Sequence, residues 1–279
     1  MKRLCIGIFA LVLATAAFAQ TEADFTVTLT SDGTGAVIKG YTGKTAQVRI
    51  PETIQGMPVR EIEAFSSSGS EFVTSVVIPQ GVTKIGIGAF EKQSFDDSKL
   101  VSITIPEGVL EIGGSAFAGT ALTEITLPQS LTSLGFGAFR GTSITTVTIP
   151  SGILSSGEEF ARCKNLRSVI ISEGIEEISQ SMFEDCGALV KVTLPDSIRV
   201  IGGQAFLGTA ITEIALPSSI EEIGYRSFAD CPNLTTVTVS GEVQHINFLE
   251  GYGGSFNGSS KINLASQAAL RRLGYTGNF

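Results

Sequence analysis

The sequence predicts a solenoid that is mostly β, with short strands stacked into a parallel sheet and short turns or 3-10 segments closing each coil on the other side. Three observations predict it: a period of 22 residues, apolar residues at fixed offsets within that period, and a proline that punctuates most repeats. The stretch Leu100–Phe139 contains the pattern nearly twice, so that Phe117 recurs as Phe139. A fixed period of this size indicates a repeat architecture, because a single repeat cannot bury its apolar face alone.

The punctuating position can be followed through most of the chain. It is occupied by Pro51, Pro79, Pro106, Pro128, Pro150, Ser172, Pro195, Pro217 and Ser240. The intervals are 28, 27, 22, 22, 22, 23, 22 and 23 residues. The two long intervals come first, which predicts insertions around residues 61–69 and 92–99 before the repeat becomes regular.

Each repeat predicts the same succession of local structures. The segment I-x-I-P alternates apolar and polar residues and is rich in β-branched side chains, which is typical of a strand. The proline cannot donate a ladder hydrogen bond, so it ends the strand. A second extended leg, V-x-x-I-G, leads to a tight bend at G-x-x-A-F. The bends supply an aromatic column at Phe90, Phe117, Phe139, Phe183, Phe206 and Phe228, which Phe160 joins one residue early.

The residues that follow the aromatic column explain the alternation between 22 and 23 residues. Short bends read F-x-G-T and end at Thr120, Thr142 and Thr209, and long bends read F-x-x-C and end at Cys163, Cys186 and Cys231. We expect this column to be buried and half-polar. Cys163 and Cys186 fall in adjacent coils, where Cα atoms roughly 5 Å apart would permit a disulfide. Free thiols are favoured over that bridge because threonine takes the same place elsewhere.

Both ends of the repeat region are predicted to carry caps, since a bare solenoid end exposes an apolar face and a strand edge. Residues 20–50 read as strands and form an N-terminal β cap. Leucine- and isoleucine-rich repeats occupy residues 51–246. Residues 247–279 form a C-terminal cap with a short helix at Ser266–Leu273, which Gly274 ends.

The first 19 residues have the features of a secretory signal peptide. Lys2 and Arg3 give a charged start, an apolar stretch follows, and an A-x-A-like cleavage site ends at Ala19. The apolar stretch is too short to span a bilayer. We therefore expect the chain to be exported and to be secreted, surface-located or periplasmic, with no stable membrane insertion.

The repeats resemble the BspA-type branch of bacterial leucine-rich repeats. The likeness covers about residues 40–246, and the lead-in GYTGKTAQVRIPETIQGMPVREIEAF is also similar to the start of such domains. The resemblance implies that the chain folds as a leucine-rich repeat solenoid. It also implies that the chain belongs among surface-exposed or secreted proteins that act in adhesion and ligand binding. It transfers no catalytic residue. Where the general pattern has Asn or Cys, this chain has Gly108 or Ser130 and their equivalents, so the Cys/Thr column is the candidate for the buried polar role.

No catalytic, cofactor-binding or metal-ligating residue is predicted, and we do not expect an enzyme. His245 is the single histidine, and no hydrolase or metal-ligand spacing surrounds it. The acid pairs Glu158–Glu159, Glu176–Glu177 and Glu221–Glu222 lack the spacing of a calcium loop and are expected to face solvent. A net charge of −8 argues against a nucleic-acid partner.

The outward-facing positions of the first leg form the candidate binding face. One column comprises Thr104, Thr126, Thr148, Ile170, Thr193, Ala215 and Thr238, and its neighbour comprises Ser102, Glu124, Thr146, Ser168, Lys191, Glu213 and Thr236. Repeat proteins use such extended surfaces for binding, although threonine also simply suits an exposed strand. The face holds no cluster of Trp, Tyr or Arg, so no hot spot stands out.

Together these features predict an exported repeat protein that binds a protein or glycan ligand through its sheet face, in adhesion to a host or cell surface. The alternative is a structural role in the cell envelope, in which coils or caps join copies of the chain into a homo-oligomer. Ice binding by the threonine column is disfavoured, because Ile170, Ala215 and Lys191 interrupt the face.

Overall fold

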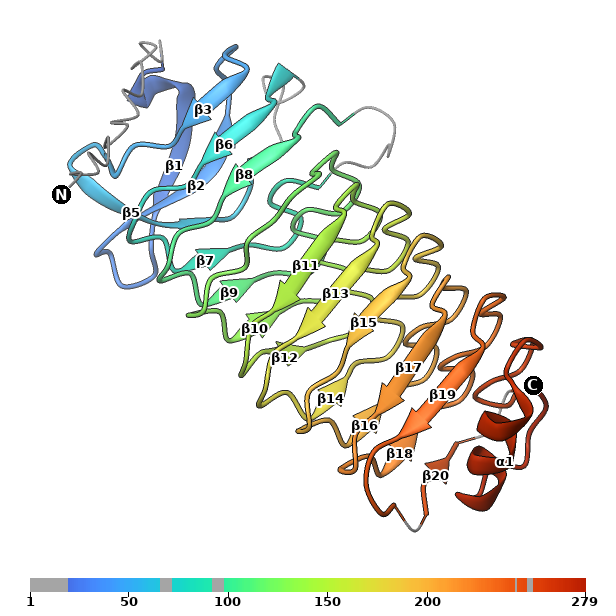
Figure 1. The fold of residues 1–279 in the computed structure, drawn as a ribbon. Coiled ribbons are helices and arrows are strands. Elements are labelled where there is room, and N and C mark those ends of the chain that lie inside the picture. The colour runs from blue at the N-terminus through green and yellow to red at the C-terminus, as the bar shows by residue number, and fades with distance from the viewer. Residues whose placement is uncertain (1–19, 66–71, 92–97, 244, 250–252) are drawn as a thin grey trace, which may run out of the picture.

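A computed structural model of the chain describes residues 20–65, 72–91, 98–243, 245–249 and 253–279. The predicted signal peptide and most of the two predicted insertions lie outside these residues. The described chain is a β-solenoid of about nine turns that ends in an α-helix, so the predicted fold class is confirmed (Figure 1). Each turn has a first leg, a second leg and a bend that leads to the next turn.

The first legs lie side by side along the molecule and form what we call the face sheet (Figure 1). Its strands are β3 (Gln47–Arg49), β6 (Ser75–Val77), β8 (Ser102–Thr104), β11 (Thr146–Ile149), β13 (Ser168–Ile171), β15 (Lys191–Thr193), β17 (Glu213–Leu216) and β19 (Thr236–Val239). They are parallel and fall into three ladders, β3-β6-β8, β11-β13-β15 and β17-β19. Val147 pairs with Val169 and Val169 with Val192, so the register follows the repeat offsets.

The second legs form a further set of short strands, which we call the leg sheet. One part has the order β1-β2-β5-β7-β9-β10-β12, with β4 paired to β5, and the other has the order β14-β16-β18-β20. The bounds are β1 (Phe25–Leu29), β2 (Ala36–Tyr41), β4 (Thr53–Ile54), β5 (Met57–Ile62), β7 (Lys84–Ile85), β9 (Glu111–Ile112), β10 (Ser133–Leu134), β12 (Leu154–Ser155), β14 (Glu177–Ile178), β16 (Val200–Ile201), β18 (Glu222–Ile223) and β20 (Asn247–Phe248). Most coils of the described chain therefore have a strand in each of their two legs, as the repeat predicts.

The core between the two sheets contains a stack of aromatic rings, which we call the ring stack. It comprises Tyr41, Phe65, Phe90, Phe117, Phe139, Phe160, Phe183, Phe206, Phe228 and Phe256. Neighbouring ring centroids are between 4.9 and 5.9 Å apart. The predicted aromatic column is confirmed, and Phe160 takes its place in it. The widest step, 5.9 Å, lies between Phe160 and Phe183.

The bends are tight turns whose backbone groups bond to the next coil, as in the 2.8 Å bond from Phe117 N–H to the Ala138 carbonyl. The Thr/Cys column is buried, as predicted. Thr120 Oγ1 donates to the Phe117 carbonyl at 2.7 Å, and Cys186 Sγ donates to the Phe160 carbonyl at 3.1 Å. Cys163, Cys186 and Cys231 are free thiols. Their role is to satisfy bend carbonyls inside the core.

The N-terminal end of the solenoid is closed by an antiparallel hairpin of β1 and β2, after the 3-10 helix η1 (Glu22–Asp24). Strand β2 then pairs in parallel with β5. The outer edge of β3 is covered by the Gln20 side chain, whose amide donates to the Gln47 carbonyl at 2.6 Å and accepts from Arg49 N–H at 2.9 Å. One side chain thus imitates a neighbouring strand at an otherwise open edge.

The first predicted insertion is misplaced in part. Glu61 and Ile62 belong to β5 and pair with β7, so they are regular leg residues. Three of the six extra residues precede them, where β4 and β5 form a hairpin around Gln55 and Gly56, both with positive φ, and the other three follow Phe65. Residues 66–69 lie outside the described part. The spacing of apolar residues could not reveal the β4–β5 hairpin, because Ile54, Met57 and Val59 of the hairpin are themselves spaced like strand residues.

The C-terminal end is covered by α1 (Leu264–Arg272). The helix begins two residues before the predicted position, because the Asn263 side chain accepts a hydrogen bond from Ser266 N–H at 2.9 Å and so caps it. Leu270 is fully buried, and Ser266 Oγ accepts from Val237 N–H of β19 at 3.0 Å. Gly274, with φ of +110°, follows the helix as predicted.

Candidate binding surfaces

The structure places the predicted face residues on the outer surface of the face sheet. Ser168 and Thr236 are half-buried, and the other predicted face residues are exposed. The residues between them point inward, and Val147 and Val169 are buried. The two columns are in register across each ladder, with Thr148 beside Ile170 of the next strand. The predicted residues therefore form two exposed rows, and their use in binding stays a prediction.

The face sheet is interrupted at residues 124–127, where the repeat predicts a strand. Ile125 of this leg is only partly buried, whereas the equivalent Val147 is buried. A hollow of about 310 Å³, which we call the face hollow, lies between this leg and β11. Its lining includes Thr126, Gln129, Thr146, Thr148 and Ile170. Its volume is at the lower end of that of ligand pockets, ~300–1,000 Å³.

The face hollow combines hydroxyl groups with an apolar rim. Three of its residues are threonines, each of which can donate and accept a hydrogen bond. Ile170 is 49% exposed and supplies apolar surface. Such a mixture suits a neutral, hydroxyl-rich or peptide-like group better than a large apolar one.

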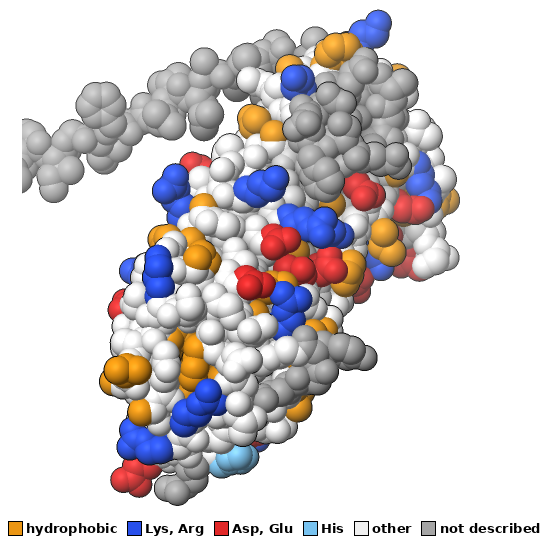
Figure 2. All heavy atoms as spheres, turned by 90° about the vertical axis from the view of Figure 1, so that its right-hand side faces the viewer, with side chains coloured by type: hydrophobic (Ala, Val, Ile, Leu, Met, Phe, Trp, Pro, Cys, Tyr) orange, Lys and Arg blue, Asp and Glu red, His pale blue; other side chains and the backbone are white. Residues whose placement is uncertain are grey.

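The charged residues of the face are not paired with one another. Within the described residues Glu124, Lys191 and Glu213 form no ion pair, although ion pairs such as Arg199–Glu221 at 2.6 Å join coils elsewhere. Figure 2 shows one side of the molecule, on which acidic and basic side chains lie next to one another and hydrophobic side chains form small separate groups. The face charges remain available to a partner.

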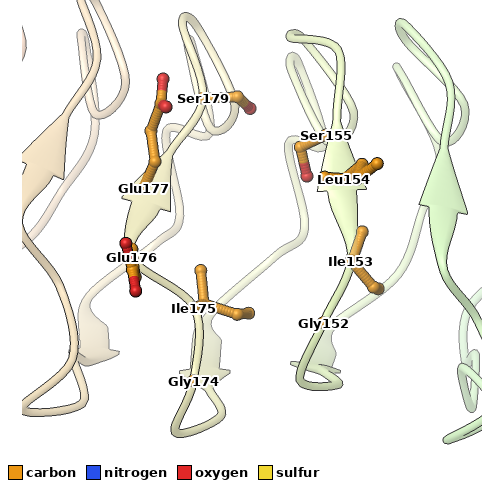
Figure 3. Close-up of a pocket in the computed structure, with 9 residues that line it drawn as sticks. All are labelled: Gly152, Ile153, Leu154, Ser155, Gly174, Ile175, Glu176, Glu177 and Ser179. Carbon is orange, nitrogen blue, oxygen red and sulfur yellow. The ribbon is translucent and has the colours of Figure 1, made fainter.

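A second hollow interrupts the leg sheet, between β12 and β14. We call it the strand gap; it has a volume of about 300 Å³ and is lined by Ile153, Leu154, Ser155, Ile175, Glu176 and Glu177, among others. Figure 3 shows β12 and β14 further apart than either is from its other neighbour. On the far side of the same two coils, β11 and β13 pair without a break. The coils therefore separate on one side only.

A missing residue accounts for the strand gap. Ten positions separate Pro150 from Phe160, whereas eleven separate the corresponding Pro128 from Phe139. The shortened leg puts Ser155 beside Leu134, at the position where other coils have a buried Leu or Ile, and Ser155 is half-buried. Without that apolar side chain, the leg of β12 lacks the core contact that places the legs of other coils side by side.

Glu159 fills the space beneath the shortened leg, and the prediction that it faces solvent is wrong. Its side chain is fully buried, and its carboxylate accepts hydrogen bonds from Ser156 N–H, Gly157 N–H and, at 2.7 Å, Ser179 Oγ. Burial raises the pKa of this carboxyl, and the three hydrogen bonds oppose the rise. The hydrogen bonds of Glu159 thus link the two coils below the strand gap.

Ser179 is a signal of the strand gap that sequence reasoning missed. Other coils have glycine at its position, and a Cβ on Gly135 would lie only 2.3 Å from the Gly114 nitrogen of the preceding coil. Serine is tolerated at position 179 because the preceding coil has moved away. A missing residue, a polar residue in an apolar column and a serine in a glycine column together mark one site.

The remaining predicted positions have simpler surroundings. Glu176, Glu177 and Glu221 are exposed, and Glu222 is half-buried and accepts from Asn247 Nδ2 at 2.9 Å. His245 is exposed. In the described ranges no group of three His, Cys, Asp or Glu side chains could hold a metal ion. No helix in that part of the chain is long and apolar enough to cross a bilayer.

The family model described as BspA type leucine-rich repeat region, with six copies, matches residues 60–156, 90–208 and 156–263. The chain belongs to the BspA-type leucine-rich repeat family. The predicted resemblance is confirmed, and it covers the region of stacked coils. No curated protein sequence matches the chain at a significant level.

Solved structures of leucine-rich repeat proteins share the fold. A leucine-rich repeat protein from Bacteroides ovatus is 26% identical, with a TM-score of 0.61 over 86% of this chain and 68% of that one. A leucine-rich repeat protein from T. pallidum is 23% identical, with a TM-score of 0.60 over 93% of this BspA-type chain and 98% of its own. A protein from Faecalibacterium prausnitzii described as a leucine rich cell surface protein is 29% identical, with a TM-score of 0.53 over 80% of this chain and 55% of that one.

Proposed function

We propose that this BspA-type chain is an exported binding protein that holds a protein or glycan ligand on its face sheet, in adhesion to a cell or host surface. The observation that carries the proposal is the pair of exposed rows on the face sheet, which are rich in hydroxyl groups and hold charges without partners. The face hollow gives the rows one concave point where a ligand group can be enclosed. The likeness to a structure described as a cell surface protein supports an exterior location.

Binding at this face costs little conformational entropy. The strands are held in register by the ladders between them, so few groups need to be ordered when a ligand binds. Threonine hydroxyls offer many weak hydrogen bonds over a long surface, which suits an extended protein segment or a glycan chain. The face lacks the aromatic anchors of a tight interface, so we expect affinity to depend on the area covered.

A binding assay on immobilised extracellular-matrix proteins and a glycan array tests the proposal. The variants Thr148→Arg and Ile170→Arg place a long charged side chain at the face hollow, and we expect each to weaken binding at least tenfold. Asn165→Arg is the matched control, because it adds the same charge at an exposed bend position away from the face. A ligand bound equally by all four proteins, or no bound ligand at all, would contradict the proposal.

Light scattering of the same proteins tests the alternative of self-assembly. A wild-type chain that forms ordered oligomers, which Ile170→Arg disperses and Asn165→Arg does not, would assign the face to contacts between copies of this chain. A monodisperse monomer that retains ligand binding supports the proposed function.

A further inference from the structure

We propose that the strand gap between β12 and β14 is a second binding site, which takes up a short extended peptide segment carrying a basic side chain. The peptide would lie between the two strands and pair with both. This site is on the leg sheet, opposite the face sheet, and does not depend on the function proposed for that face.

The two walls of the strand gap present complementary backbone groups. In the next coil, Arg199 N–H and Val200 N–H bond to the Glu176 carbonyl and Gly202 N–H bonds to the Ile178 carbonyl, at 2.8 to 3.1 Å. The equivalent donors one coil earlier belong to Glu176, Glu177 and Ser179. The equivalent acceptors are the carbonyls of Ile153 and Ser155, because Leu154 pairs with Ser133 of β10. Within the described residues no such bond joins these two legs.

One wall therefore offers amide donors and the other offers carbonyl acceptors. A strand placed between them in parallel would restore both ladders, because each strand presents donors and acceptors on both edges. Insertion of one strand needs walls about 10 Å apart, twice the usual spacing of ~4.8 Å. Addition of a peptide to free strand edges is a recurrent mode of recognition, in which the main chain supplies affinity and alternate side chains supply selectivity.

The ends of the strand gap limit the length of the peptide. The two coils meet again at Ser172 N–H, which bonds to the Ile149 carbonyl at 3.1 Å, and at Glu158 N–H, which bonds to the Gln180 carbonyl at 3.0 Å. A guest can therefore insert only two to four residues and must leave toward solvent at both ends. The volume of about 300 Å³ agrees with so short an insertion.

The side chains around the strand gap select the charge of the guest. Glu176 and Glu177 are exposed on one wall, and neither forms an ion pair in the described part of the chain. Leu154 on the other wall is 76% exposed and would be covered by an apolar side chain of the guest. A guest that alternates apolar residues with one lysine or arginine satisfies both walls.

Glu159 and Ser179 keep the strand gap at a fixed width. Their hydrogen bond lies directly beneath it, and the ladder between β11 and β13 holds the opposite side of the coils. The site is therefore prepared in advance, which lowers the cost of binding.

The test uses a labelled peptide of sequence TVKVT and the full chain, with fluorescence anisotropy as the readout. We expect binding that weakens at least tenfold when the peptide's valine amides are N-methylated, because N-methylation removes the ladder donors. Replacement of the peptide's lysine by glutamate should weaken binding to a similar degree. Hydrogen exchange should show that the amides of Glu176, Glu177 and Ser179 become protected when the peptide binds.

A variant that closes the strand gap supplies the decisive comparison. It replaces Ile153–Phe160 with the one-residue-longer segment Leu131–Phe139 of the preceding coil and carries Ser179→Gly. We expect it to lose peptide binding. Should this graft fail to fold by circular dichroism, the double variant Glu176→Lys, Glu177→Lys provides the test, with at least tenfold weaker binding expected.

Two results would overturn the proposal. One is a wild-type chain that does not bind the peptide, and the other is binding that survives N-methylation or, in the folded graft, closure of the strand gap. The face variant Ile170→Arg should bind the peptide as wild type does, so failure of the face proposal and failure of this one remain distinguishable.

Discussion

At the scale of single residues, the spacing of the coils on the leg sheet depends on glycine. A Cβ added to Gly224 would lie 2.4 Å from the Gly203 nitrogen and 2.7 Å from the Gly202 carbonyl carbon, both in the backbone of the preceding coil. Backbone atoms held by two ladders cannot give way as a flexible side chain can. The glycine column therefore sets how closely successive second legs approach.

We expect Gly224→Ala to lower the free energy of unfolding by about 2–3 kcal/mol, because overpacking against backbone forces two coils apart. Thermal and urea unfolding followed by circular dichroism measure the change. Gly187→Ala is the control, since a Cβ there meets nothing within 4 Å, and its effect should stay within about 0.5 kcal/mol. Equal stability of the two variants would show that the coils are not in close contact at this column.

Glu159 makes the stability of the protein depend on pH. Burial raises the pKa of its carboxyl, so the folded chain holds this proton more tightly than the unfolded chain does. Its protonation therefore favours the folded state below the ordinary pKa near 4.5, and this contribution is lost as the pH rises through the raised pKa. Glu159→Gln keeps the shape and a donor toward Ser179 Oγ but cannot ionise.

We expect the stability of the wild-type chain relative to Glu159→Gln to rise as the pH falls from 7 toward 4.5. The slope is bounded by one proton, about 1.4 kcal/mol per pH unit. Urea unfolding at several pH values measures it. Glu158→Gln is the control, since Glu158 forms a partly exposed ion pair with Arg140 at 3.1 Å. A pH dependence that is the same in wild type and Glu159→Gln would contradict the expectation.

At the scale of elements, the ring stack ties the bends together along the whole core. Phe183 is fully buried, with its ring 5.9 Å from that of Phe160 and 5.5 Å from that of Phe206. Each ring therefore supports two neighbours, and loss of one ring leaves a cavity that fixed bends cannot close.

We expect Phe183→Ala to lower the free energy of unfolding by about 3–5 kcal/mol, as removal of a buried aromatic ring does in other cores. Chemical unfolding measures the change, and Phe72→Ala at a 55% exposed position is the control. A cost below about 1 kcal/mol would show that the bends relax around the missing ring and that the stack is not a rigid element.

The elements that follow the repeat could be predicted from the sequence, and the two interruptions of the sheets could not. Alternation fixes which side of a first leg faces inward, so the exposed rows at Thr148 and Ile170 follow directly from spacing. The shortened leg before Phe160 is also visible in the sequence. That it opens the strand gap depends on how Glu159 and Ser179 meet across two coils, and spacing alone does not report such a contact.

At the scale of the whole molecule, the solenoid depends on its two covered ends. Helix α1 seals the last coil through Leu270 and the hydrogen bond from Val237 N–H to Ser266 Oγ. Beside it, Phe248, Phe256, Tyr275 and Phe279 form a ring cluster in which Tyr275 and Phe279 both lie beneath the Arg271 guanidinium. This end of the solenoid is therefore covered by packed aromatic rings and is not an open coil.

We expect Leu270→Asp to displace α1 from the last coil, because the substitution buries an unpaired charge in the C-terminal cap. The exposed edge of β19 should then pair with other copies, and light scattering should show growing oligomers. Amides of Thr236–Val239 should exchange faster. Ala268→Asp, on the exposed side of the same helix, is the control. A Leu270→Asp chain that stays monomeric with unchanged exchange would show that the last coil does not need the helix.

The sequence predicts that both ends are capped, but it does not predict the individual contacts that form the caps. Composition predicts that an apolar end must be covered and where strands or a helix can do so. It does not predict that Gln20 imitates a strand edge or that Asn263 starts the helix early, because both depend on a single side chain reaching a backbone that folds from distant residues.

The ring stack also suggests how such a molecule changes length. The ring-to-ring steps lie between 4.9 and 5.9 Å, with 5.0 Å between Phe117 and Phe139. Duplication of one 22-residue repeat would therefore lengthen the solenoid by one such step and place each new coil beside neighbours that it already fits. The length of the solenoid can therefore change in evolution by whole repeats, without new contacts between coils.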